Sequence, residues 1–96
     1  MLTVMGYSIS ERAQNAGRAA IAVRLRSFSA AQIGRAMEPH IRTSSDAWYG
    51  MTIRQAAEAA AEHVIWSEYK AGRLKPTGQW LNRQYWRRVT KQGGDN

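Results

Sequence analysis

Basic and aromatic side chains are concentrated near the end of the chain. Residues 73–96 hold six Lys or Arg residues against one acid, Asp95, which gives this segment a net charge of +5. Cations at this density neutralise phosphate, and an indole among them can stack on a base or anchor a protein contact. The chemistry indicated is therefore the binding of an anion or of a partner. The binding residues that we expect are Arg73, Lys75, Arg83, Trp86, Arg87, Arg88 and Lys91.

A second group of candidates lies outside this segment. Residues 1–42 carry a net charge of +4, whereas residues 43–72 sum to −2. Two separate cationic zones in a chain of net charge +7 attract polyanions and acidic protein surfaces. Trp66 and Tyr69 stand beside two carboxylates, and they fit either a packing surface or a partner site. The secondary binding candidates are Arg35, Arg42, Trp66 and Tyr69.

Residue patterns that mark enzymes are missing from the sequence. His40 and His63 lie in different segments, and the spacings that place metal ligands on one helical face do not occur. The serines form no nucleophile elbow, and Gly93 and Gly94 close the chain instead of opening a helix around a phosphate. We expect a protein that is not an enzyme, with no catalytic residues, no metal and no cofactor.

Composition narrows the class of protein further. The chain has no cysteine, which excludes disulfides and thiolate zinc sites. Its apolar runs are only a few residues long, and its first residues do not resemble a secretory signal. We therefore expect a cytoplasmic protein that does not enter a membrane.

Helix starts are marked by Ser or Thr followed three positions later by Glu or Gln, the capping-box pattern. The pairs are Ser8 with Glu11, Ser29 with Gln32 and Thr52 with Gln55. Pro39 and Gly72 are helix stops, and Pro76 with Thr77 offers a further start. The pattern predicts helices over residues 9–27, 30–37, 53–71 and 78–91.

These helices predict an all-α fold, a small single-domain bundle of four to five helices. The Ala-rich helix 53–71 lies at its centre, because its small residues let neighbouring helices approach closely. Residues 1–91 form the helical domain, and the glycine-containing residues 92–96 form a flexible C-terminal tail. The only strand candidate is the segment 2–7.

The predicted helix 78–91 carries the main functional expectation. Trp80, Leu81, Tyr85 and Val89 form its inward stripe, and Arg83, Arg87 and Lys91 follow one another at four-residue steps beside it. Trp86 projects away from the stripe toward solvent. The helix is thus expected to present bases and an indole to a partner.

The run Phe28 to Met37 resembles the first helix of a helix-turn-helix, with Gly34 as the small residue that lets a second helix cross closely. The resemblance implies a recognition segment near residues 43–49, whose hydroxyl groups reach phosphates or base edges. The sequence departs from the pattern at Glu38–Pro39, which replaces the usual turn glycine and following apolar residue.

Three functions fit these observations. The first is binding of nucleic acid or a nucleoprotein complex through the basic C-terminal segment. The second is inhibition of a partner protein by direct contact with an acidic surface. In size and composition the chain looks like the accessory proteins of phages and other mobile elements, including anti-CRISPR inhibitors. The third is self-association as a homodimer that covers exposed aromatic side chains.

Overall fold

The computed structural model describes residues 2–89. Its elements, in chain order, are β1 (Leu2–Val4), β2 (Tyr7–Ile9), α1 (Glu11–Ala22), β3 (Phe28–Ser29), α2 (Ala30–Met37), the 3₁₀ helix η1 (Glu38–His40), α3 (Ile53–Lys70), β4 (Leu74–Trp80) and β5 (Arg83–Arg88). The described chain is thus an α+β fold with two antiparallel sheets. The prediction of an all-α helical bundle is wrong.

The largest correction concerns the predicted helix 78–91, which is a β-hairpin as far as the structure describes it. Leu81 and Asn82 have φ angles of 51° and 63° and form the two-residue turn between β4 and β5. Positive φ at both central residues defines the tight hairpin turn whose twist matches antiparallel strands. A helix would instead have stacked Arg83 over Arg87, a repulsive arrangement. Arg83 and Arg87 lie on strand β5, so among the described residues the predicted helical row of bases is not formed.

The first helix is shorter than predicted. Residues 7–9 pair with residues 2–4 in a hairpin, so the helix begins at Glu11. The strand candidate 2–7 is confirmed only in part, because residues 5 and 6 form a turn between two short strands. Its N-cap is Ser10, whose side chain accepts a hydrogen bond from the Ala13 N–H at 3.1 Å. The predicted cap at Ser8 is wrong, because Ser8 lies in β2.

The two other predicted helix starts are confirmed. The Gln32 side chain accepts a hydrogen bond from the Ser29 N–H at 2.9 Å at the start of α2. Gln55 accepts from the Thr52 N–H at 2.8 Å, and the Thr52 hydroxyl accepts from the Gln55 N–H at 3.2 Å. Hydrogen bonds between residues three positions apart therefore mark the starts of α2 and α3.

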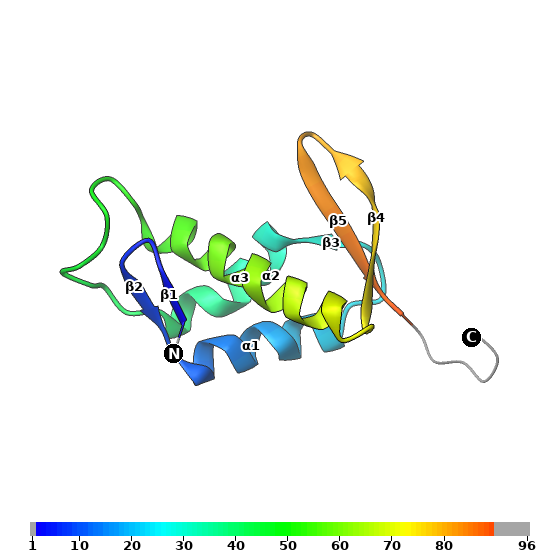
Figure 1. Ribbon diagram of the computed structural model, residues 1–96, viewed down its shortest axis with the longest axis horizontal. Helices are drawn as coiled ribbons and strands as arrows, with labels where there is room; N and C mark the ends of the chain where they lie inside the picture. Colours follow the sequence, from blue (N-terminus) through cyan, green and yellow to red (C-terminus); the bar gives the residue numbers. More distant parts are fainter. Residues whose placement is uncertain (1, 90–96) are drawn as a thin grey trace.

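The helices form the body of the molecule, with a sheet at each end (Figure 1). The β1–β2 hairpin lies at the end that holds the N-terminus, and the β4–β5 hairpin rises from the opposite end. β3 pairs with β5, so the second sheet has the order β3-β5-β4, with β3 and β4 at its two edges. α3 contacts both other helices and strands of both sheets, which confirms its predicted central place.

The core lies between the helices and the inner faces of the sheets. Phe28, Ile33, Met37, Ile9 and Ile65 are its largest fully buried side chains. Alanines of α3 supply much of the rest, so the neighbouring helix α2 packs close to its backbone. Within residues 2–89, no helix is both long and apolar enough to span a bilayer.

The expected recognition segment of a helix-turn-helix is not helical. Residues 41–52 form an irregular loop with isolated turns. The Trp48 N–H of this loop donates to the Met5 carbonyl at 2.9 Å, and the Ser44 hydroxyl donates to the Gly6 carbonyl at 3.0 Å. The loop is therefore held against the N-terminal hairpin, and Gly34 faces α3.

Candidate anion-binding site

Basic side chains gather where α1 ends, α3 ends and the β4–β5 hairpin opens. We call this region the basic end. Its contacts tie the three elements together: the Arg73 N–H donates to the Glu68 carbonyl of α3 at 2.9 Å, and Arg88 of β5 donates to the Arg24 carbonyl just after α1 at 2.8 Å. The members of the basic end are Arg18, Arg24, Arg26, Lys70, Arg73, Lys75, Arg87 and Arg88.

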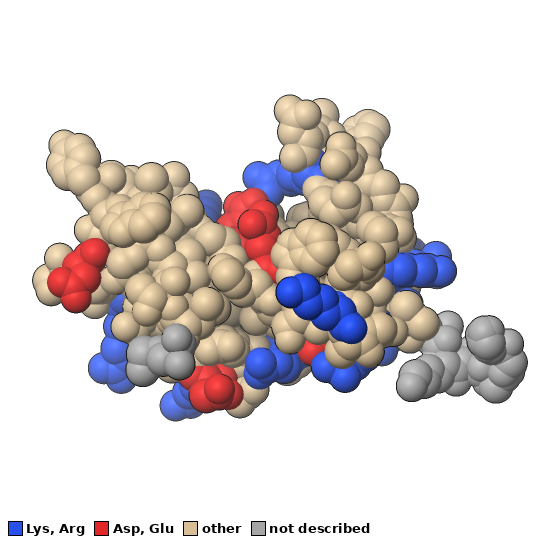
Figure 2. Space-filling view, viewed as in Figure 1, with Lys and Arg blue, Asp and Glu red and all other residues tan. Residues whose placement is uncertain are grey.

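The charge of the molecule is divided unevenly between this end and the rest. Eight cations of the basic end face one carboxylate, Glu68, so the region carries a net charge of +7. The remaining described residues hold five cations and five carboxylates and are neutral in sum. In the space-filling view of Figure 2, most acidic groups lie over the left and centre, whereas basic groups lie over the right and also along the lower left. The surplus charge of residues 2–89 is thus concentrated at one end.

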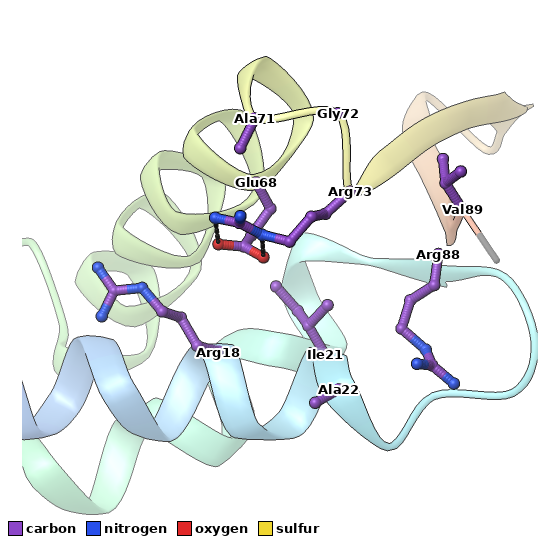
Figure 3. Close-up of a pocket in the computed structure, with 9 residues that line it drawn as sticks. All are labelled: Arg18, Ile21, Ala22, Glu68, Ala71, Gly72, Arg73, Arg88 and Val89. Atoms are coloured by element: carbon purple, nitrogen blue, oxygen red, sulfur yellow. Dashed lines mark hydrogen bonds and ion pairs between the residues drawn. The ribbon is translucent and has the colours of Figure 1, made fainter. Parts of the chain in front are cut away.

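A cavity of about 370 Å³ lies within the basic end (Figure 3). Arg18 lines it from α1, with its Nη1 donating to Asn15 Oδ1 at 2.6 Å, Arg73 reaches it from the residue before β4, and Arg88 points from β5 toward the chain that follows α1. Apolar side chains complete the wall, so the cavity suits an anion attached to a less polar group. Its lining residues are Arg18, Ile21, Ala22, Glu68, Ala71, Gly72, Arg73, Arg88 and Val89.

Glu68 is the one carboxylate in this cavity, and it is held by Arg73. Arg73 donates from Nε to Oε1 at 2.7 Å and from Nη2 to Oε2 at 3.0 Å, a bidentate pair. The hydrogen bonds from Arg73 lower the pKa of Glu68, and the nearby charges of Arg73 and Arg18 add to this against the opposing effect of burial. The pKa of Arg73 is raised by the same pair. Glu68 therefore stays ionised and fixes Arg73 in place.

Arg88 is positioned by the backbone. Its Nε donates to the Arg24 carbonyl at 2.8 Å, which leaves the terminal nitrogens without an acidic partner among the described residues. This bond also anchors the segment after α1 to β5. Arg88 is thus oriented without losing its charge.

Lys75 and Arg87 form the exposed part of the site. They are directly opposite each other on β4 and β5, so their side chains leave the hairpin on the same face. Both are exposed, and neither has an ion pair within residues 2–89. Two adjacent like charges repel unless an anion lies between them.

The structure brings together four of the seven main candidates, namely Arg73, Lys75, Arg87 and Arg88. Arg83 lies apart from them near the hairpin turn, where it donates to Glu58 Oε2 at 2.8 Å. Lys91 and the predicted tail at residues 92–96 lie outside the described residues. Arg35 and Arg42 are exposed but line other hollows of the surface.

Trp86 does not project into solvent. It pairs with Phe28 across β5 and β3 and is only 6% exposed. Its ring packs edge-on against those of Trp66 and Tyr69, with centroids 5.5 Å apart in both cases. The expectation of a stacking indole at Trp86 is therefore wrong, whereas Trp66 is 50% exposed and Tyr69 is 40% exposed. The three aromatic candidates form one cluster.

Sequence reasoning missed half of the basic end. Arg18, Arg24, Arg26 and Lys70 join the site only because α1 and α3 both end beside the hairpin. The sequence offered only weak indications of these residues. Lys70 lies at the end of a helix whose stop at Gly72 was predicted, but the arginines of residues 1–42 were predicted to form a separate cationic zone. Their convergence is a property of the tertiary fold.

Two further surface features carry exposed apolar side chains. The loop 41–52 exposes Trp48 and Tyr49, and the hairpin turn exposes Trp80 and Leu81.

Within residues 2–89, no three His, Cys, Asp or Glu side chains are grouped as metal ligands.

No family model matches the sequence, and no characterised protein or solved structure was found that resembles the chain.

Proposed function

We propose that this protein binds nucleic acid, alone or within a nucleoprotein complex, and that the basic end contacts the phosphate backbone. The observation that supports this most directly is the concentration of a net charge of +7 at one end of residues 2–89. Phosphate contacts require charge and little geometric precision, and they supply most of the affinity for nucleic acid that does not depend on base sequence. The proposed role is binding without catalysis or cofactor, in the cytoplasm.

The individual contacts of the basic end fit this role. Lys75 and Arg87 present two exposed cations side by side, and the cavity adds Arg18 and Arg88 behind them. Arg73 is committed to Glu68, so we assign it to holding the cavity in shape and not to phosphate. A phosphate between Lys75 and Arg87 would relieve the repulsion of that pair.

Salt dependence of binding tests the proposal. We expect the affinity for a short oligonucleotide, measured by fluorescence anisotropy, to fall steeply as salt rises from about 50 mM to 200 mM, because released counterions drive phosphate binding. Arg87→Ala should weaken binding and reduce the slope of log K against log salt by about 1.

Arg42→Ala is the matched control. Arg42 is also exposed, and its substitution removes the same charge as Arg87→Ala. It lies on the loop beside the N-terminal hairpin, away from the basic end. It should leave the slope unchanged. No oligonucleotide binding at low salt, or equal effects of the two substitutions, would reject the basic end as the binding surface.

A second candidate is a protein partner, as in an inhibitor that acts by direct contact. The observation that favours it is the pair of apolar side chains at the β4–β5 turn, where Trp80 is 66% exposed and Leu81 is 76% exposed. Exposed Trp and Leu beside Arg83 form the mixture of side chains common in protein interfaces. Absence of oligonucleotide binding would favour this candidate.

A further inference from the structure

An aromatic pocket lies between α3 and the β4–β5 hairpin. Its cavity is about 300 Å³, and the rings of Trp66, Tyr69 and Trp86 pack edge-on at centroid distances of 5.3–5.5 Å. Trp86 is the buried base of this cluster, so Trp66 and Tyr69 provide the accessible ring surface. The residues that line the pocket are Glu62, Ile65, Trp66, Tyr69, Pro76, Gln84 and Trp86.

The pocket adjoins the basic end. Lys70 follows Tyr69 and lies one helical turn beyond Trp66, so it extends from the same side of α3. Lys75 precedes Pro76 on β4, and Arg87 follows Trp86 on β5. A polyanion held by the basic end therefore passes beside an open aromatic surface.

The sheet edge connects the two surfaces. Pro76 and Trp86 are directly opposite each other and line the pocket on the inner face of the hairpin, whereas Lys75 and Arg87 project from the outer face. β4 is the edge strand, with no neighbour on its outer side among the described strands. A flexible chain can thus cross β4 with its charged groups outside and an aromatic group inside.

Polar groups of the pocket suit a nucleobase. Glu62 is exposed and has no ion pair within residues 2–89, so its carboxylate can accept from a base amino group. The Gln84 amide nitrogen already donates to the Gly78 and Tyr85 carbonyls at 2.9 Å, which leaves its oxygen as a second acceptor. A phosphate is repelled by Glu62 and attracted by Lys70 and Lys75. These charges orient a nucleotide with its base in the pocket and its phosphate at the edge.

We propose that the nucleic acid bound by this protein is single-stranded, and that an unpaired base enters the pocket of Trp66, Tyr69 and Trp86 while the backbone crosses β4. This inference rests on the proposed nucleic-acid function and specifies its substrate. A base inside a duplex is stacked on both faces and cannot reach the pocket without leaving the helix. Single strands combine aromatic stacking with phosphate contacts, which is the combination found here.

The test compares a labelled single-stranded oligonucleotide of mixed sequence with the duplex of the same sequence and length, by anisotropy at two salt concentrations. We expect the wild-type protein to bind the single strand about ten-fold more tightly, since one stacked base contributes a factor of this order. Trp66→Leu should reduce single-strand affinity by about five-fold or more and leave duplex affinity unchanged. Arg87→Ala should weaken both.

Trp48→Leu is the matched control, because Trp48 is also exposed but lies on the loop 41–52. It should bind both forms like the wild type. If circular dichroism shows that Trp66→Leu is unfolded, Tyr69→Leu replaces it with the same expectation. Equal or tighter duplex binding, or a folded pocket variant with wild-type affinity for the single strand, overturns this inference alone. Absence of binding to either form overturns the nucleic-acid function as well.

Discussion

Leu81 is a bulky residue in a backbone conformation that suits glycine or asparagine. Its φ of 51° places it in the left-handed region, at the first central position of the β4–β5 turn. Such a conformation costs an ordinary side chain about 1–2 kcal/mol, and Leu81 recovers little of this by burial because it is 76% exposed. Strained, exposed positions of this kind are found at functional surfaces.

Leu81→Asn is expected to stabilise the protein. Asparagine tolerates the left-handed region and is favoured in such turns, so the free energy of unfolding in urea should rise by about 1 kcal/mol. Leu25→Asn is the control, since Leu25 is 82% exposed and is not among the described residues with positive φ. If a protein partner uses the turn, the same Leu81 variant loses affinity for that partner although it is more stable. A destabilised Leu81→Asn would show that the turn depends on this leucine.

Glu68 makes stability depend on pH in a defined direction. Its pKa is lowered below 4.5 by the hydrogen bonds from Arg73, so the folded state favours the ionised form more than the unfolded state does. The resulting stabilisation is present above the ordinary pKa and is lost as pH falls through the lowered pKa.

We therefore expect the urea concentration at the unfolding midpoint to decrease as the pH is lowered from 7 to about 3. The decrease should be smaller in Glu68→Gln, which lacks the ionisable group. At pH 7 Glu68→Gln should be less stable than the wild type, and the difference should shrink at low pH. Glu62→Gln removes an exposed carboxylate from the same helix and is the control. Equal pH dependence of wild type and Glu68→Gln would contradict this role of the ion pair.

At the scale of elements, the sequence predicted what local chemistry determines. The starts of α2 and α3 depend on side chains three residues apart, and both helices begin and end within one residue of the prediction. The β4–β5 hairpin depends on contacts between distant segments, because Trp86 of β5 pairs with Phe28 and packs on Trp66. Its turn also lacks the glycine that would have marked it. Gly78, at the first position of the predicted helix, was the available warning against it.

Gly34 permits the close packing of α2 on α3. A Cβ atom at this position would lie 3.0 Å from both the backbone N and the Cα of Glu58, atoms that cannot move without shifting α3. Gly34→Val should therefore lower the free energy of unfolding by about 1–3 kcal/mol, measured by urea denaturation.

Arg35→Val measures the cost of a β-branched residue in the same helix, because Arg35 is the exposed neighbour. The loss at Gly34 should exceed the loss at Arg35. If the two losses are equal, helix propensity and not the approach of α3 limits this position.

For the whole molecule, composition led to a hypothesis about the class of partner but did not predict the shape of the candidate site. The excess of bases in residues 73–96 drew attention to Lys75, Arg87 and Arg88, which the structure places close together. Arg18 and Lys70 complete the region because two helices end at the same place, and no spacing along the chain encodes that. Ion pairs distinguish two of the predicted binding residues from the others, because Arg83 is paired with Glu58 and Arg73 is paired with Glu68.

A body that is neutral over most of its surface and strongly positive at one end has a large electric dipole. Near a polyanion such a molecule turns before it collides, so a greater share of encounters begins in the correct orientation. In the proposed complex, the opposite pole, with the exposed Trp48 and Tyr49 rings of the loop 41–52, would face away from the polyanion. A bound copy would then present a face that is neutral in sum and carries exposed aromatic rings, unlike the cationic face by which it is attached.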